Sequence, residues 1–402
     1  MSAIATAGGI TSAQGFSVGI GEASIRQSGG PDLVLLGSDR PASAAATFTT
    51  NRMRAAPVLL AEQALAAHGG TIRGIVINAG CANAGTGTDG LNDARAVLVA
   101  AAEHLGCEPQ EVLPASTGLI GSRLPVAAMV AAIPALRLHR SRAASTRAAR
   151  AIMTTDTRPK QHAVSISLAD GRIVRVGGMA KGAGMIHPQM ATMLAFLATD
   201  APIDPRTLGS RLRPAVDRTF NQVSVDGDTS TNDAVIVLAN GAAGGPPLDA
   251  PDLDVFADAL EAVCRTLAIA IAADGEGARH LIEVVVSGAA DDADARAVAR
   301  TIAASSLVKT AVHGADPNWG RIAAAAGRSG VRLDPDRMRI CIGDVAVYDG
   351  TPLAFDEPRA RRILRGATVP IAVDLLGGDG RGTAWGCDLS AAYVAINSEY
   401  TT

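Results

Sequence analysis

The stretch KGAGMIHPQMATMLAFLATD places the hydroxyl of Thr192 directly after Ala191, at the start of an apolar run. The approach KGAGM is flexible and rich in small residues, and the Ala191 carbonyl directly before the hydroxyl is unhindered. Threonine is at home in strands and its hydroxyl can bond to nearby backbone, so one interpretation is purely structural. The chemical interpretation is that this hydroxyl attacks the preceding carbonyl, moves the acyl group from nitrogen to oxygen, and loses the resulting ester to water. Holding both groups in one chain favours attack on so inert an amide.

Self-cleavage would leave Thr192 with a free α-amino group beside its hydroxyl. An α-amine has an ordinary pKa of about 7.7 to 8.0, against about 10.4 for a lysine side chain. A useful fraction is therefore neutral near neutral pH and can accept a proton. One residue would then supply both the nucleophile and its base, which suits acyl transfer or amide hydrolysis.

Further segments, spread nearly end to end, point in one direction. They are TTNRMRAAPV, PASTGLIG, AIMTTDTRPK, KGAGMIHPQMATML, VSVDGDTSTNDAV, ADGEGA, SLVKTAVHGADPNWGRI and AWGCDLSAAYVAINSEYTT. With these segments in this order, the sequence resembles the ornithine acetyltransferases of arginine biosynthesis, the glutamate N-acetyltransferase family. Because so many motifs occur in one order, the resemblance is specific.

The resemblance implies an activity and an assembly. The enzyme would move an acetyl group from N2-acetyl-L-ornithine to L-glutamate by a ping-pong mechanism through acetyl-Thr192, releasing ornithine and N-acetylglutamate. Self-cleavage would give an alpha chain, residues 1–191, and a beta chain, residues 192–402. These chains would form one intertwined folded unit and pair into a heterotetramer. No metal or organic cofactor is implied, and acetyl-CoA stays open as a second donor because no residue here separates members that use it.

The resemblance also assigns roles to matching positions. Thr192 would be the nucleophile, and Thr117 with Gly118 would form the oxyanion hole, which fits a glycine-containing turn that aims donors at a developing oxyanion. The positions for substrate binding are Thr155, Lys181, Thr192, Glu276, Asn397 and Thr402. Lys181 could pair with a carboxylate, and Glu276 suits an ammonium group. Without the resemblance, STG is typical of a simple turn, a lysine is typically solvated, and Glu276 is typical of a surface charge.

Some residues depart from the family's usual pattern. Gln189 stands where asparagine is usual, the cysteine of INAGCANAGTG is moved to Cys81, and Arg279 and His280 replace the residues usual after GEGA. None of these occupies an assigned position. They leave fine specificity open, since changes beside a site can shift substrate preference without changing the reaction.

Two alternatives to the transferase remain. A self-cleaving aminopeptidase or amidohydrolase of similar fold would pass the acyl group to water, although the NxxxxT ending and the TTDT segment favour transfer. A descendant that keeps the fold only as an interaction scaffold is disfavoured by the intact Thr192, Lys181 and Thr117. Assays with and without glutamate distinguish the first alternative from the transferase. Failure of the purified protein to cleave itself would favour the second alternative.

These residues need helices and strands to bring them together. The spacing of apolar residues predicts helices over residues 92–106 and 251–274, and strands over 72–78, 281–288, 338–350 and 369–376. A helix-like segment spans the arginines from 137 to 150, and YVAI near the end predicts a strand-like segment. The expected fold is α+β, with stacked mixed β-sheets flanked by helices, resembling that of the ornithine acetyltransferases and self-processing aminopeptidases.

Composition excludes several classes of protein. The 402 residues are 48% hydrophobic but only 3% aromatic, which indicates a folded chain with an aliphatic core and excludes disorder. A net charge of −3, without a strongly basic half, makes nucleic acid an unexpected partner. The sequence shows no signal peptide and no apolar run of about 18 residues that could span a membrane. Five scattered cysteines without a CxxC pair predict reduced thiols in the cytoplasm.

Three short motifs imitate known sites. GFSVG at residues 15–19 matches a nucleophile elbow but lacks the preceding strand and oxyanion loop that this motif needs. DGDTSTND at 226–233 lacks the glycine and glutamate of a calcium loop, and GGDGRG at 377–382 lacks the helix of a dinucleotide site. GFSVG is therefore set aside as a nucleophile, and the other two segments are interpreted as turns. The seven histidines have no ligand spacing, so no metal site is predicted.

Overall fold

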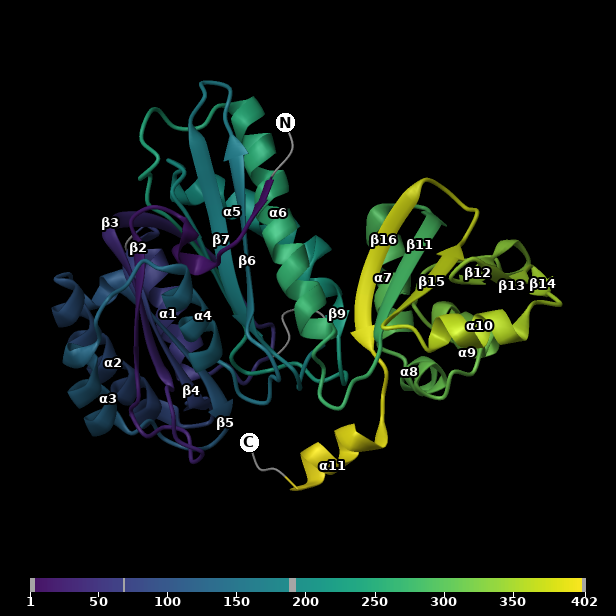
Figure 1. The fold of residues 1–402 in the computed structure, drawn as a ribbon, viewed down its shortest axis with the longest axis horizontal. Coiled ribbons are helices and arrows are strands. Elements are labelled where there is room, and N and C mark those ends of the chain that lie inside the picture. Colours follow the sequence, from purple (N-terminus) through teal and green to yellow (C-terminus); the bar gives the residue numbers. More distant parts are fainter. Residues whose placement is uncertain (1–3, 68, 188–192, 400–402) are drawn as a thin grey trace.

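The computed structural model describes residues 4–67, 69–187 and 193–399. Two mixed β-sheets, each covered by helices, organise this part of the chain (Figure 1). The larger sheet contains β1 Ile4–Thr6, β2 Phe16–Gly21, β3 Leu33–Phe48, β4 Thr71–Cys81, β5 Val112–Leu119, β6 Lys160–Ser167, β7 Ile173–Lys181, β8 Leu194–Thr199 and β10 Ala234–Ala239. The smaller sheet contains β9 Val223–Ser224, β11 Leu281–Ala289, β12 Arg339–Ile342, β13 Val345–Asp349, β14 Thr351–Pro352, β15 Thr368–Asp374 and β16 Gly380–Cys387.

Helices connect and cover these strands. The α-helices are α1 Ala56–Ala67, α2 Gly87–Leu105, α3 Val126–Ala132, α4 Arg142–Ala151, α5 Pro205–Arg218, α6 Ala250–Ala272, α7 Asp292–Ala303, α8 Ser306–His313, α9 Trp319–Gly327, α10 Glu357–Leu364 and α11 Ala391–Glu399. Short 3-10 turns are η1 Ile10–Ser12, η2 Pro109–Glu111, η3 Ile133–Ala135, η4 Phe220–Gln222 and η5 Pro335–Arg337. Within the described residues, no helix is long and apolar enough to cross a membrane.

The larger sheet runs without a break across the two halves of the sequence. Its strand order is β1-β6-β7-β8-β10-β3-β4-β5, with β2 also paired to β3. The central strands β8 and β10 follow Thr192 in the sequence and lie between β7 and β3, which precede it. β7 and β8 are antiparallel, and Lys181 lies opposite Leu194. The chain therefore leaves the sheet at Lys181 and returns to it at Leu194, at neighbouring positions on the same edge of the sheet.

Strand β10 illustrates why this sheet holds together. Val235 and Val237 pack into the apolar cluster that includes residues of α5 and α6, whereas Ile236 and Leu238 pack into the cluster with residues of α1 and α4. All six residues of the strand are buried. A strand covered on both faces reads as a continuous apolar run, and VIVL is such a run.

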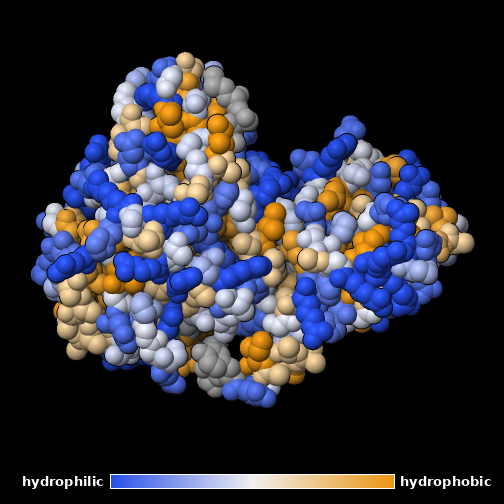
Figure 2. All heavy atoms as spheres, in the orientation of Figure 1, coloured by the Kyte–Doolittle hydropathy of each residue, from blue (hydrophilic) through white to orange (hydrophobic). Residues whose placement is uncertain are grey.

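The smaller sheet buries one face. In β11 the even-numbered residues Ile282, Val284 and Val286 are buried against α7 and its neighbours, while Val285 is 41% exposed. This alternation is the expected pattern for a strand with one covered face. The surface of both regions mixes charged, polar and smaller apolar areas on the face shown in Figure 2.

Most of the predicted elements are confirmed. The predicted helices correspond to α2 and α6, although α2 already begins at Gly87, and the predicted strands correspond to β4, β11 and β15. The segment 338–350 folds as the hairpin β12–β13 rather than as one strand, because Gly343 turns the chain at φ +59°. The arginine segment is helical only from Arg142, where Ser141 caps α4 by accepting the Ala144 amide.

The prediction of a strand-like segment at YVAI is wrong. These residues lie in α11, which has no buried residue. None of the described strands pairs with this segment, and backbone hydrogen bonds within a helix satisfy its main chain instead. Ser17 of GFSVG lies inside strand β2, and residues 226–233 form an irregular loop with bends before β10. GGDGRG is a turn only in part, because residues 377–379 bend and 380–382 already begin strand β16.

Candidate active site

A cavity of about 720 Å³ gathers the assigned residues that the structure describes. Its lining includes Thr117, Gly118, Thr155, Lys181, Glu276 and Asn397, which come from β5, the turn after α4, β7, the loop after α6, and α11. The remaining assigned residues, Ala191, Thr192 and Thr402, lie outside the described residues. Distant parts of the sequence thus meet around one polar space.

Gly118 allows two strands to approach unusually closely. It lies opposite Gly80 near the end of the parallel pairing of β5 with β4, where the register becomes irregular. Its φ of +133° suits glycine, and a Cβ atom at this position would lie 2.2 Å from the Gly80 carbonyl carbon. Only glycine therefore fits. The neighbouring Thr117 is 3% exposed. STG is consequently the irregular end of a buried strand and not the simple turn that its sequence suggests in isolation.

Lys181, the last residue of β7, is buried and not solvated. Its Nζ donates to the Thr154 hydroxyl at 2.6 Å and to the Thr117 hydroxyl at 3.3 Å, and lies 3.9 Å from Asp156 Oδ2. Burial lowers the pKa of Lys181, and the negative charge of Asp156 opposes this shift. The cation therefore lies directly beside the predicted oxyanion residue.

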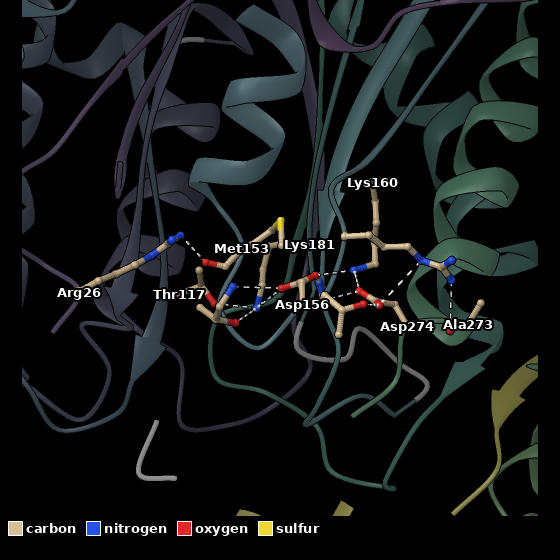
Figure 3. Close-up of polar contacts among 12 residues, drawn as sticks. Arg26, Thr117, Met153, Asp156, Lys160, Lys181, Ala273 and Asp274 are labelled. Atoms are coloured by element: carbon tan, nitrogen blue, oxygen red, sulfur yellow. Dashed lines mark hydrogen bonds and ion pairs between the residues drawn. The ribbon is translucent and has the colours of Figure 1, made fainter. Parts of the chain in front are cut away.

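A second buried lysine extends this charge cluster away from the cavity (Figure 3). Lys160 Nζ donates to Asp156 Oδ1 at 2.6 Å and to Asp274 Oδ2 at 2.5 Å. Although burial raises the pKa of Asp156, the charges of Lys181 and Lys160 outweigh it and hold this pKa at about 2. Asp156 is therefore ionised throughout the neutral range. Figure 3 shows it lying between the two lysines, with Asp274 on the far side of Lys160.

The last described helix, α11, contributes Asn397 to the cavity lining. Asn397 of α11 donates from Nδ2 to Glu276 Oε2 at 2.8 Å, and the Glu276 amide donates to the Ala183 carbonyl at 2.9 Å. Tyr393 on the same helix donates to Asp226 Oδ2 at 3.2 Å. Glu276 is half-buried, so it is not the surface charge that its loop position alone suggests.

Two polar residues ahead of β10 were missed by reasoning from the sequence. Asn232 donates to the Ala82 and Ser116 carbonyls at 2.7 and 2.9 Å and lines the cavity. Asp233 is fully buried, and its Oδ1 accepts the Met193 amide at 2.8 Å. Its Oδ2 has no hydrogen-bond partner among the described residues. Burial raises the pKa of Asp233 well above its usual value, against the opposing effects of the Met193 amide and Lys181.

A signal for these residues was present in the sequence. Asn232 and Asp233 stand directly before the apolar run AVIVLA, and Asp156 and Lys160 lie in the quoted TTDTRPK. Polar residues that lead into or out of a buried strand end at the edge of the sheet, where sites form.

Within the three described ranges, no group of His, Cys, Asp and Glu is arranged to hold a metal ion.

Comparisons with known proteins identify one family. The ArgJ family model matches residues 17–402. The arginine biosynthesis bifunctional protein ArgJ of Thermosynechococcus vestitus is 50% identical over 413 residues, which cover 98% of each chain. The protein of the same name from Parasynechococcus marenigrum is 49% identical over 396 residues, covering 98% of this chain and 96% of that one. A solved ArgJ structure from Bacillus halodurans shows 47% identity and a TM-score of 0.49, covering 50% of this chain and 96% of that chain.

These matches and the site define a class of protein. The chain is an acetyltransferase built on mixed β-sheets flanked by helices, as its sequence predicted. It belongs to the ArgJ family. Both the resemblance found in the sequence and the expected fold class are thereby confirmed.

Proposed function

We propose that this enzyme transfers an acetyl group from N2-acetyl-L-ornithine to L-glutamate, through acetyl-Thr192, in cyclic arginine biosynthesis. The observation that carries the proposal is the single cavity in which Thr117, Gly118 and Lys181 meet Glu276 and Asn397. The name of these relatives, arginine biosynthesis bifunctional protein, supports the pathway. The word bifunctional also supports acetyl-CoA as a second acetyl donor, with coenzyme A thiol as the group released.

The position of β8 supports self-cleavage at Thr192. Leu194 pairs with Lys181, so the chain returns to the sheet beside the Thr117 hydroxyl two residues after the predicted nucleophile. In the reaction the Thr192 hydroxyl oxygen bonds to the Ala191 carbonyl carbon, the amide C–N bond breaks, and the hydroxyl proton passes to the new amine. Water then hydrolyses the ester, leaving the Ala191 carboxylate and a free Thr192 hydroxyl.

Transfer uses the same groups in two half-reactions. The Thr192 hydroxyl attacks the acetyl carbonyl of N-acetylornithine, and its α-amine takes the proton and delivers it to the departing ornithine nitrogen. Thr117 and the Gly118 amide stabilise the oxyanion, and Lys181 supplies positive charge beside them. Glu276 binds a substrate ammonium group. Glutamate then attacks acetyl-Thr192, which reverses these proton transfers and releases N-acetylglutamate.

The assembly is part of the proposal. Residues 1–191 and 192–402 remain one folded unit after cleavage, which is supported by β8 and β10 lying between strands of the first segment. Two such units form a heterotetramer in the cytoplasm, where the five free cysteines stay reduced. The chemistry written above needs no metal or organic cofactor, because the chain's own groups supply the nucleophile, the base and the oxyanion donors.

Mass measurement tests the nucleophile. Intact mass of purified protein should reveal a fragment that begins at Thr192, whereas Thr192→Ala should stay at full length. Brief incubation with N-acetylornithine without acceptor should add one acetyl group, which peptide mapping places on Thr192. A wild-type chain that stays whole after prolonged incubation contradicts self-cleavage, and acetylation that needs both substrates contradicts the ping-pong mechanism.

Omission of glutamate tests the acceptor. A transferase releases little ornithine beyond one equivalent unless glutamate is present, because water attacks the acetyl-enzyme slowly. Multiple turnovers without glutamate would instead show the aminopeptidase-like alternative, in which water is the acceptor.

A further inference from the structure

Lysine is rare in this chain, and every lysine is buried. Only three of the 36 Lys and Arg residues are lysines, namely Lys160, Lys181 and Lys309. Each is 2% exposed. Arginine occupies all the other positions counted as Lys or Arg. The three lysines therefore occur where a compact point charge on a slim side chain fits inside the protein. Lys181 lines the cavity and Lys309 lies near the small sheet, which leaves the role of Lys160 to be explained.

Lys160 does not line the cavity, yet it connects the segments that do. Its two partners, Asp156 and Asp274, are also absent from the lining. The side chains of Lys160, Asp156 and Asp274 are 1%, 0% and 4% exposed. A buried cation between two buried carboxylates is tightly held, because the interior screens these charges weakly.

Asp156 is the link from Lys160 to Lys181. Its Oδ1, which accepts from Lys160, also accepts the Gly182 amide at 2.7 Å, directly after Lys181. Its Oδ2 accepts the Thr154 amide at 3.1 Å. Asp156 therefore fixes both the backbone that carries the Lys181 ammonium and the residue whose hydroxyl receives that ammonium.

Asp274 is the link from Lys160 to Glu276. It accepts the Thr157 amide at 3.1 Å and also a short hydrogen bond from the Thr157 hydroxyl. Two residues later the same loop presents Glu276 to the cavity. Lys160 thus anchors the beginning of the loop that carries this carboxylate.

We propose that Lys160 is a positioning residue for acetyl transfer, which holds the Lys181 ammonium at Thr117 through Asp156 and the Glu276 loop through Asp274. This inference rests on the proposed function of the cavity. Lys160 neutralises Asp156, so Lys181 keeps its shorter contacts with the two hydroxyls. Without the Lys160 charge, Asp156 would have Lys181 as its nearest cation and would draw it from 3.9 Å into direct contact, away from Thr117.

The pH profile separates positioning from simple structural support. The charged groups that face Lys181 are Asp156, Lys160, Asp233 and Glu276. Burial lowers the pKa of Lys181 and the positive charge of Lys160 lowers it further, while the three carboxylates raise it. If the protonated form of Lys181 is the active one, activity falls as pH rises through its pKa. Removing the Lys160 charge should therefore move this alkaline limb to higher pH.

The experiment compares Lys160→Met with Lys309→Met as its matched control. Lys309 is equally buried, but its Nζ is held by the Cys387 and Ser224 carbonyls. Both variants should lower the thermal midpoint. In processed protein, Lys160→Met should lower kcat by about 10- to 100-fold, since misplacement of about 1 Å can cost about 100-fold. Its alkaline limb should move up, whereas Lys309→Met should change neither kcat nor the limb.

Asp274→Asn keeps the test decisive if Lys160→Met does not fold. The amide is close in size to the carboxylate, and the variant leaves Lys160 with Asp156 as its only carboxylate partner. Asp156 is then less available to Lys181, so the alkaline limb should move to lower pH. Shifts of opposite sign in the two variants support the inference, as does the Asp274→Asn shift alone.

The inference is overturned if processed Lys160→Met matches Lys309→Met in kcat, or if neither Lys160→Met nor Asp274→Asn moves the alkaline limb. Wild-type protein that performs no acetyl transfer overturns the proposed function and this inference together. Active wild type with unchanged variants overturns the role of Lys160 alone.

Discussion

The two sheet regions bury the same kind of residue for different purposes. At the edge of the larger sheet, Lys181 lines a cavity and contacts hydroxyls, and Lys160 lies behind it among carboxylates. Near the smaller sheet, Lys309 is held by backbone carbonyls and lines no part of that cavity. Burial of a charge therefore does not identify a site by itself. The partners of the buried cation distinguish a site from a structural contact. Hydroxyls and carboxylates beside open space can be exchanged for substrate groups, whereas main-chain carbonyls packed inside the protein cannot.

Matched glycine substitutions should give the largest contrast between the regions. Gly118→Ala and Gly380→Ala each place a Cβ atom 2.2 Å from backbone carbon, of Gly80 and of Asp291 respectively. Gly118→Ala should lower kcat of the folded fraction by about 100- to 1000-fold, the range for losing an oxyanion donor. Gly380→Ala should lower the thermal midpoint but leave kcat of folded protein within about twofold, since Gly380 lines no part of the cavity.

Thermal unfolding and transfer assays on the same preparations check this contrast. An equal loss of kcat in both variants would show that strain, and not the position of the Gly118 amide, determines the effect.

The second contrast concerns the lysines themselves. Lys181→Met removes a cation whose Nζ lies 3.3 Å from the Thr117 hydroxyl, and Lys309→Met removes one of equal burial elsewhere. A hydrogen bond to a charged group contributes about 1.5 to 3 kcal/mol, so Lys181→Met should lower kcat/KM by about 10- to 150-fold. Lys309→Met should leave it nearly unchanged. Initial rates with N-acetylornithine and glutamate measure both, and equal losses would contradict the distinction drawn here.

The sequence predicted the scaffold better than the network within it. Apolar periodicity was sufficient for β4, β11, β15, α2 and α6, because burial of a face leaves a regular pattern. Lys160 and Asp274 carry no such pattern, because they lie far apart in the chain and meet only when β6 starts beside the end of α6. The error at YVAI has a related cause: a short apolar segment becomes strand or helix according to whether a sheet edge is available.

The site residues divide in the same way. The resemblance assigned Thr155 to substrate binding, and the structure places it in the cavity lining. However, the hydroxyl that accepts the hydrogen bond from Lys181 Nζ belongs to Thr154. Asp233 was considered only as part of a turn, because its environment depends on Met193 and on burial from several elements. Hydrogen-bond partners that come from segments far apart in the chain produce no spacing pattern in the sequence, so they could not be predicted from it.

A smaller effect is expected at the contact between α11 and the rest of the cavity. Asn397→Ala removes the 2.8 Å hydrogen bond to Glu276, which is partly exposed. Water can replace part of this bond, so KM should rise by about three- to tenfold, less than the full contribution of a hydrogen bond to a charged group. Ser398→Ala is the control, since among the described residues that hydroxyl donates within its own helix, to the Ala395 carbonyl. Equal KM values in both variants would exclude a role for the Asn397–Glu276 contact in binding.

The smallest effects should appear in the pH dependence of stability, where two buried aspartates differ in sign. Burial raises the pKa of Asp233, and its Oδ2 has no partner among the described residues. Burial also raises the pKa of Asp388, but hydrogen bonds from His313 and from the Arg279 and His280 amides outweigh it and lower the pKa overall. One carboxyl therefore favours its neutral form in the folded state and the other its charged form.

Neutral amides at these positions should change stability in opposite directions. As pH rises above about 4, the unfolded chain ionises Asp233 before the folded protein does, so the wild type loses stability that Asp233→Asn retains. Asp388 contributes stability above about pH 4 and loses it as pH falls through its lowered folded pKa, so Asp388→Asn should be less stable at neutral pH. Thermal midpoints of the two variants between pH 4 and 8 should diverge by about 1 to 3 °C on either side of the wild type. Because both substitutions keep the size of the side chain and an oxygen acceptor, a shift of the same sign in both would mean that lost packing, and not ionisation, sets the stability of these positions.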